Sequence, residues 1–131
     1  MAKKKTKLGQ GLLKGMKEAV AAEKGNRFNK GKLRWRNIPM FLMEPLVEVG
    51  QAGELKYSTF NFLNGLSVND TLDSLKRHLA AAESPYSPDI DPETNCDHLA
   101  SVAWNALVAL HMIKTRPDLD DRLKLKKKRK K

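Results

Sequence analysis

The chain has 131 residues and a formal net charge of +10 at neutral pH. That length fits one compact domain and is too short for two. The charge is divided unevenly, since residues 1–36 carry a net +10, residues 37–121 a net −8 and residues 122–131 a net +8. An acidic middle between two basic ends excludes a protein that coats DNA with a uniformly basic surface.

The apolar runs and the cysteine count bear on the compartment. No apolar stretch reaches the ~18–20 residues that a membrane-spanning helix needs, so we expect no membrane association. The Lys-rich start is followed by residues too polar for the apolar part of a signal peptide. Cys96 is the only cysteine, which excludes an intramolecular disulfide and a Cys-rich zinc site. We therefore predict a cytoplasmic protein.

The first part of the chain is predicted to hold little regular structure. The Lys- and Gly-rich residues 1–11 are typical of a disordered tail, and residues 12–23 have the apolar spacing of a short amphipathic helix. Residues 24–37 are predicted to be an ordered loop. A helix is expected over 39–56 with an interruption before Pro45, because proline suits the first turn of a helix.

The clearest helical pattern follows a loop predicted over residues 57–66. Ser67 or Asn69 can act as the N-cap of this helix. Apolar residues then recur at spacings of four, three, four and three, which predicts one continuous buried face. The residues of this face are Val68, Leu72, Leu75, Leu79 and Ala82. The aromatic anchors expected in the preceding loop are Tyr57, Phe60 and Phe62.

Another long helix is predicted over 97–113, after a proline-containing loop at 84–96. Thr115 and Asp118 resemble a capping box, which predicts a last helix that ends in the basic tail. We expect an all-α fold, in which residues 12–121 form a small bundle of about four helices between disordered basic tails. The apolar face predicted for the 97–113 helix comprises Leu99, Val102, Ala103, Ala106, Leu110 and Ile113.

Candidate ligands concentrate in the acidic middle. Asp91 and Glu93 lie in the proline-containing loop, while His98 and Asn105 share one face of the helix that follows. Carboxylates, a histidine and an amide suit a hard divalent cation such as Mg²⁺ or Mn²⁺, which can bridge to phosphates.

The preceding helix carries Asp70, Asp73 and Arg77 on one face, with His78 beside its apolar stripe. Helices joined by one loop pack as antiparallel neighbours, so these polar groups are expected to converge with those of the next helix. A simpler interpretation stays open, because first-turn carboxylates also stabilise the helix dipole. Trp104 is expected to be a core anchor rather than a platform for a base.

Short motifs in a fixed order connect residues 28 to about 110 with a known family. They include Phe28-Asn29-Lys30-Gly31-Lys32, Gly53-Glu54-Leu55-Lys56-Tyr57, Asp73-Ser74-Leu75-Lys76-Arg77-His78-Leu79, Asp91-Pro92-Glu93-Thr94 and Trp104-Asn105-Ala106. In these motifs the chain resembles the N-terminal domain of dATP/dGTP diphosphohydrolases, a phage and bacterial family of small all-α proteins related to MazG-like nucleotide pyrophosphohydrolases.

The resemblance implies a Mg²⁺- or Mn²⁺-dependent hydrolase that converts purine (deoxy)nucleoside triphosphates to monophosphate and pyrophosphate. It also implies a homo-oligomer and, for a phage-encoded chain, a place in the host cytoplasm. The implied catalytic residues are Glu54, His78 and Glu93. The implied substrate-binding residues are Lys56, Tyr57, Asn61, Arg77 and Asn105, and the implied metal ligands are Asp91, Glu93 and His98.

The basic tails support an alternative function, which is non-enzymatic and non-specific binding of DNA or RNA. Clustered lysines neutralise phosphates without reading base sequence. The same tails are also compatible with folding back onto the acidic middle or with a role in solubility alone. The candidate nucleic-acid contacts at the C-terminal end are Lys126, Lys127, Lys128, Arg129, Lys130 and Lys131.

Overall fold

The computed structural model describes Gln10 and residues 25–126. The helix predicted over 12–23 therefore lies outside the described residues. The same holds for residues 1–9 of the predicted N-terminal tail and for residues 127–131 of the C-terminal one.

The chain divides into two units, Met1–Arg34 and Trp35–Lys131. In the first unit, residues 25–34 form no helix or strand, as predicted for a loop. Within these residues a turn is closed by the Lys32 N–H, which donates to the Asn29 carbonyl at 3.1 Å. All further description concerns the second unit.

The second unit is mostly helical and begins with two short 3₁₀ helices, η1 (Trp35–Asn37) and η2 (Met40–Met43). The α-helix α2 (Glu44–Lys56) follows directly, with Pro45 in its first turn. A proline is tolerated there because the first N–H groups of a helix have no partner within the helix. The predicted interruption before Pro45 is confirmed as the change from 3₁₀ to α geometry.

Helix α3 (Val68–Glu83) begins where the sequence predicts. Its N-cap is Ser67 rather than Asn69, since the Ser67 hydroxyl oxygen accepts a hydrogen bond from the Asp70 N–H at 3.1 Å. Val68, the first apolar residue of the predicted face, is fully buried, whereas Leu79 near the other end is 37% exposed. The predicted face therefore packs best at the N-terminal end of the helix.

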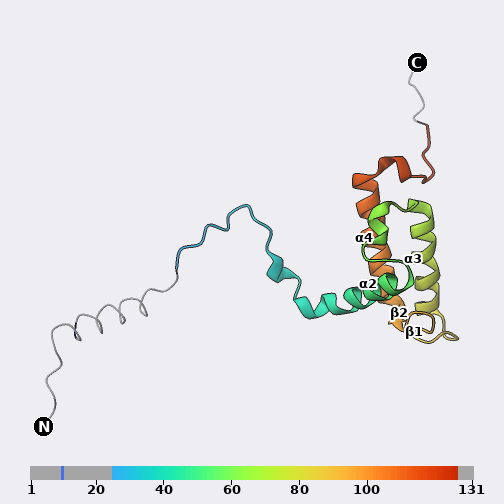
Figure 1. Cartoon of the computed structure of the whole chain (residues 1–131), viewed down its shortest axis with the longest axis horizontal. Helices are drawn as coiled ribbons and strands as arrows, with labels where there is room; N and C mark the ends of the chain where they lie inside the picture. Colours follow the sequence, from blue (N-terminus) through green and yellow to red (C-terminus); the bar gives the residue numbers. More distant parts are fainter. Residues whose placement is uncertain (1–9, 11–24, 127–131) are drawn as a thin grey trace, which may run out of the picture. The chain divides into compact units, whose positions relative to one another are not determined.

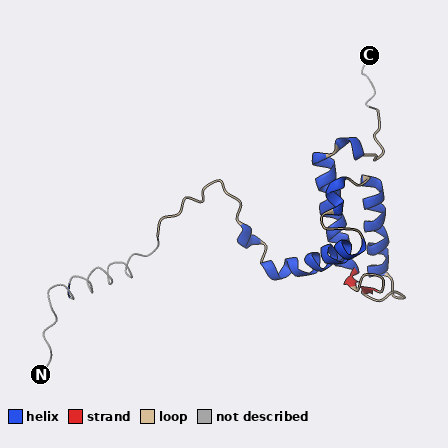
Figure 2. Ribbon diagram, viewed as in Figure 1, coloured by secondary structure: helices blue, strands red, loops and turns tan. Residues whose placement is uncertain are grey.

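A hairpin that the sequence analysis did not foresee connects α3 to the last long helix. Strands β1 (Ile90–Asp91) and β2 (Cys96–Asp97) pair antiparallel, and Asn95 adopts a left-handed conformation with φ 58° in the turn. Two-residue strands are too short for an alternating pattern to be detected. The hairpin reverses the chain, so that α4 (His98–Thr115) runs antiparallel to α3 at its side (Figures 1 and 2).

The core is small and lies between α3 and α4. Its fully buried members are Val68 on α3 with Val108, Ala109 and Met112 on α4. Phe62 covers one end of this core from the preceding 3₁₀ helix η3 (Asn61–Asn64). The ring of Phe62 meets the ring of Trp104 edge to face, with a distance of 5.4 Å between their centroids. Of the three predicted aromatic anchors, Phe62 alone packs on this core, while Tyr57 and Phe60 are exposed.

The apolar face predicted for α4 is wrong in its main part. Leu99, Ala103, Ala106 and Leu110 are exposed, while Val102 and Ile113 are half-buried. The buried side chains belong to a different face, which includes Ala100, Ser101, Val108, Ala109 and Met112. Because α4 carries apolar residues nearly all the way around, periodicity alone did not determine which face meets the core.

Among the described residues, no helix combines the length and the apolar character that a membrane span requires.

The predicted last helix is also wrong. Thr115 ends α4 instead of capping a new helix, and its hydroxyl donates to the His111 carbonyl at 2.8 Å. Only the short 3₁₀ helix η4 (Pro117–Leu119) follows, and residues 120–126 are not helical. Pro117 accounts for this, because a residue before proline avoids the α conformation, and Arg116 has φ −134° and ψ 64°.

The segment after η4 folds back onto the start of α3. The Asp121 carboxylate accepts hydrogen bonds from the Ser67 hydroxyl at 2.6 Å and from the Asn69 N–H at 2.8 Å. These two hydrogen bonds lower the pKa of Asp121. A carboxylate at this position also suits the positive end of the helix dipole. Asp121 thus supplements the Ser67 cap from a distant part of the chain.

Candidate functional site

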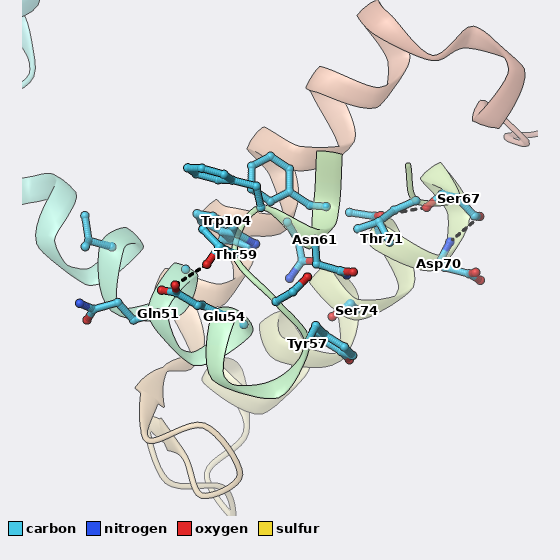
Figure 3. Close-up of a pocket in the computed structure, with 18 of the residues that line it drawn as sticks. Gln51, Glu54, Tyr57, Thr59, Asn61, Ser67, Asp70, Thr71, Ser74 and Trp104 are labelled. Atoms are coloured by element: carbon cyan, nitrogen blue, oxygen red, sulfur yellow. Dashed lines mark hydrogen bonds between the residues drawn. The ribbon is translucent and has the colours of Figure 1, made fainter. Parts of the chain in front are cut away.

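A pocket of about 700 Å³ lies between α2, the segment after it, α3 and α4 (Figure 3). This volume is within the range of sites that hold small-molecule ligands. Each wall contributes a different kind of side chain.

Helix α3 provides a polar wall. Its lining residues are spaced so that they share one helical face, which lies beside the apolar face that packs on α4. Arg77 is the only cationic side chain on the lining within the described part of the chain, and Asp70 is an anionic one. The α3 side of the pocket is formed by Ser67, Asp70, Thr71, Ser74 and Arg77.

Helix α2 and the turn after it provide the second wall. Glu54 faces the pocket from α2, and its carboxylate accepts a hydrogen bond from the Thr59 hydroxyl at 2.5 Å. Phe60 then adopts a left-handed conformation with φ 57°, which costs a non-glycine residue about 1 kcal/mol. This turn brings Asn61 and Phe62 onto the pocket lining, while Tyr57 borders it (Figure 3).

Helix α4 provides an aromatic and amide wall through Trp104 and Asn105. Helix α2 approaches Trp104 closely at Gly50, where an added Cβ would lie only 3.2 Å from the indole ring. The Asn105 side-chain amide donates to the Ser101 carbonyl at 2.8 Å. This hydrogen bond accounts for an amide in an apolar helix and leaves the side-chain oxygen of Asn105 as an acceptor.

Five of the residues predicted from the sequence meet at this pocket. Glu54, Tyr57, Asn61, Arg77 and Asn105 all lie on its lining. They come from α2, α3, α4 and the segment between α2 and α3. Arg77 and Asn105 meet here as expected for the polar groups of two neighbouring helices, whereas the contributions of Glu54, Tyr57 and Asn61 were not apparent from spacing along the chain.

The other predicted residues form a separate group beside the hairpin. We call Lys56, His78, Asp91, Glu93 and His98 the hairpin cluster. The imidazoles of His78 and His98 are joined through their Nδ1 atoms at 2.9 Å, and the Lys56 ammonium pairs with Glu93 at 2.7 Å. None of these five residues lines the pocket.

Burial and nearby charges set the ionisation of the cluster. Loss of hydration lowers the pKa of His78 below its ordinary value, although the carboxylate of Asp91 partly opposes this shift. The pKa of Asp91 is lowered in turn. Burial works against its ionisation, but hydrogen bonds from the Glu93 N–H and the Thr94 hydroxyl and the charge of the imidazoles outweigh that effect.

The cluster does not assemble the implied metal ligands into one set. In the described ranges, no three His, Cys, Asp or Glu side chains converge as a metal site. Both carboxylate oxygens of Asp91 already accept hydrogen bonds, and Glu93 is paired with Lys56. Asp91, Glu93 and His98 as they stand therefore do not fit a divalent cation, and we derive no reaction step through a metal held by them.

The comparison with protein families gives one match. The family described as dATP/dGTP diphosphohydrolase, N-terminal, matches residues 22–122. The chain belongs to this family. The part of the chain that matches the diphosphohydrolase family contains α2, α3 and α4, and it therefore includes the pocket and the hairpin cluster. Comparisons with curated proteins and with solved structures find no match.

Several lining residues were not singled out by the sequence analysis. Ser67, Thr71 and Ser74 share the face of Asp70 and Arg77 at helical spacing, a polar stripe that could have been recognised. Asp70 was a candidate for the polar face, but its place in the first turn of α3 also gives it a purely structural role, which is to stabilise the helix dipole. The contribution of Gln51, Thr59 and Trp104 depends on how α2 and its following turn meet α4, and no spacing along the chain reveals this.

Proposed function

We propose that this chain hydrolyses purine (deoxy)nucleoside triphosphates to the monophosphate and pyrophosphate, with the substrate bound in the pocket between α2, α3 and α4. Membership of the dATP/dGTP diphosphohydrolase family supports the reaction class and the purine substrate. The observation that carries the proposal is the grouping of Arg77, Glu54 and Trp104 around one cavity of nucleotide size.

The lining offers a partner for each part of a nucleotide. The guanidinium of Arg77 is suited to phosphate oxygens, because it presents paired donors at a fixed angle. Trp104 and Phe62 supply apolar aromatic surface for a purine ring. Asn61 and Asn105 carry both donor and acceptor groups, which suit the edge of a base or the hydroxyl of a sugar.

The charge of the pocket favours a substrate that brings its own cation. The described lining carries two carboxylates, Glu54 and Asp70, and one cationic side chain, Arg77, so its positive charge is too small to balance a triphosphate. We propose that the nucleotide enters as its Mg²⁺ or Mn²⁺ complex, since oxygen ligands of this kind suit both ions. The ion would polarise the phosphate and favour ionisation of a bound water.

Glu54 is the proposed general base. A carboxylate within reach of a water molecule can accept its proton as the water attacks the α-phosphorus, and the bond from that phosphorus to the leaving pyrophosphate breaks. Thr59 holds one oxygen of Glu54, which fixes the orientation of the carboxylate and leaves the second oxygen for the water.

The hairpin cluster is proposed to position the pocket residues. His78 directly follows Arg77 on α3, and Lys56 directly precedes Tyr57 at the end of α2. The His78–His98 pair therefore links α3 to α4, and the Lys56–Glu93 pair links the end of α2 to the hairpin that joins those two helices. This role replaces the catalytic role that the family resemblance implied for His78 and Glu93, and the metal role that it implied for Asp91 and His98.

The test is a product assay with pocket variants. The purified chain is incubated with dATP, dGTP, dCTP or dTTP and Mg²⁺ or Mn²⁺, and pyrophosphate and monophosphate are measured. We expect dATP and dGTP to be hydrolysed, each with one pyrophosphate released for every monophosphate. Arg77→Ala and Glu54→Gln should each lower the rate by 100-fold or more, in line with the loss of a charged transition-state partner or a general base.

Lys76→Ala is the matched control. Lys76 lies next to Arg77 on α3, is exposed and does not line the pocket. Its replacement should leave the rate within about twofold. The proposal fails if no purine nucleotide yields pyrophosphate, or if Arg77→Ala and Glu54→Gln retain the rate of Lys76→Ala. Binding of nucleic acid through the basic tails stays a prediction from the sequence.

A further inference from the structure

Phe60 combines two features that do not favour folding. Its backbone is left-handed, with φ 57°, a conformation that bulky side chains rarely adopt and that glycine or asparagine would hold at lower cost. Its ring is 67% exposed, and among the described residues it is not one of those packed on the core between α3 and α4. Neither the turn nor the core therefore explains a phenylalanine at this position.

The backbone around Phe60 is nevertheless fixed on both sides. The Asn61 N–H donates to the Ser58 carbonyl at 3.2 Å, and the Leu63 N–H donates to the Phe60 carbonyl at 2.9 Å. A strained residue that its surroundings hold in place is typical of sites that contact a ligand. Phe60 lies on the lining of the pocket, so the strain is located where a ligand would be met.

The aromatic side chains on the described pocket lining differ in how much of each ring is free. Trp104 and Phe62 are half-buried, and they pack on each other and on the core. Tyr57 is exposed, but the Lys56 ammonium lies over its ring, 5.4 Å from the centroid. Over Phe60, no aromatic or cationic partner lies among the described residues. Phe60 therefore offers the freest aromatic face on the lining.

We propose that Phe60 stacks on the base of the bound nucleotide and thereby makes the pocket select purines over pyrimidines. This role rests on the proposed function, which puts a nucleotide in the pocket. An aromatic ring stacks on the flat face of a base, and the two fused rings of a purine cover more of a phenylalanine than the single ring of a pyrimidine does. Phe60 follows α2 whereas Arg77 lies on α3, so different walls hold the base and the phosphates.

The stacking role is tested by calorimetry, with slowly hydrolysed dGTP and dCTP analogues and Mg²⁺ added to the full chain. Phe60→Asn removes the ring but keeps a residue that tolerates the left-handed conformation, so in urea unfolding it should be at least as stable as the wild type. It should bind the dGTP analogue about 10-fold more weakly, which is within the range for loss of one base–aromatic stack, and the dCTP analogue should lose less. Phe60→Tyr keeps the ring and should restore binding of the dGTP analogue.

Phe41→Asn is the matched control. Phe41 is 66% exposed, close to the value for Phe60, but it does not line the pocket, so its replacement should leave the binding of both analogues unchanged. If Phe60→Asn binds the dGTP analogue as tightly as Phe41→Asn does while Arg77→Ala does not, the stacking role is wrong and the proposed function stands. Equal weakening of the two analogues in Phe60→Asn, or a loss of its stability, would also overturn the role. A wild type that binds neither analogue would overturn the proposed function and the stacking role together.

Discussion

The pocket and the hairpin cluster contain similar residue types but differ in how their polar groups are used. In the hairpin cluster the polar groups largely satisfy one another, through the His78–His98 and Lys56–Glu93 pairs. In the pocket, Arg77 and Asp70 lie on the lining of an open cavity, and Figure 3 shows Asp70 there on α3. Groups that are already paired have little left to offer a ligand, because binding would first have to break the existing interactions.

Acidic and histidine residues that lie close together in the sequence are therefore a poor guide to the position of a site. The hairpin cluster contains the predicted metal ligands Asp91, Glu93 and His98, which lie within eight residues of one another. The pocket gathers residues from α2, α3 and α4, which are far apart in the chain. The following predictions test whether the two regions are as different as the structure indicates, beginning with the largest expected effect.

Nucleotide binding should depend far more on the pocket than on the hairpin cluster, because the cluster acts only through the position of the pocket residues. A slowly hydrolysed dGTP analogue with Mg²⁺, at about 100 times its dissociation constant, should stabilise the wild type by about 2.7 kcal/mol. Arg77→Ala should lose most of this stabilisation, while Glu93→Gln should lose only a small part of it. Thermal unfolding with and without the analogue measures both. If Glu93→Gln loses as much as Arg77→Ala, the division between the two regions is wrong.

Packing at the pocket wall should respond to a single methyl group. Gly50→Ala places a Cβ 3.2 Å from the Trp104 ring, whereas the Cβ of Gly53→Ala meets nothing within 4 Å. Both glycines lie in α2, so each substitution gains about 1 kcal/mol of helix propensity. Overpacking costs about 1–3 kcal/mol, so Gly50→Ala should be the less stable of the two. Urea unfolding of the pair measures the difference, and equal stability would contradict the close approach at Gly50.

His78 of the hairpin cluster should make the free energy of unfolding depend on pH. The pKa of His78 is lower in the folded chain than in the unfolded one, so the unfolded chain binds more protons as the pH falls through about 6.5, the ordinary pKa of histidine. His78 therefore contributes stability above that pH, and the contribution is lost as the pH falls toward its folded pKa.

Urea unfolding between pH 8 and pH 5 measures this effect. His78→Gln should flatten the decline in unfolding free energy below pH 6.5. His111→Gln is the control, since His111 is exposed on α4 and outside the cluster, and it should follow the wild type. A decline that is equally steep in His78→Gln would show that the imidazole pair does not couple to folding.

The sequence was most informative where one face of a helix is clearly apolar. In α3 the buried start at Val68 was predictable, because polar residues occupy the other side, and the cap was narrowed to Ser67 or Asn69, of which the structure has Ser67. In α4 nearly every side is apolar, so periodicity did not distinguish the buried side of the helix from the exposed side that carries Leu99 and Leu110. Thr115 and Asp118 matched a capping box, but the effect of Pro117 on the residue before it was stronger.

The candidate site was predictable as a set of residues but not as a location. Arg77 and Asn105 were identified from the family resemblance, and the pocket lining includes both. Trp104 was expected to serve the core, and it does so through Phe62 while also lining the pocket. Which polar groups would pair with each other and which would face a cavity depends on the hairpin, and that element left no periodic pattern in the sequence.

The Asp121 contact gives the pocket a mechanical link to the end of the described chain. Ser67 lines the pocket, and its hydroxyl is held by Asp121, 54 positions later. The first turn of α3 thus serves as both a pocket wall and an anchor point for the chain beyond η4. Because Asp121 holds both the Ser67 hydroxyl and the Asn69 N–H, we expect the geometry of this wall of the cavity and the attachment of the segment to depend on each other.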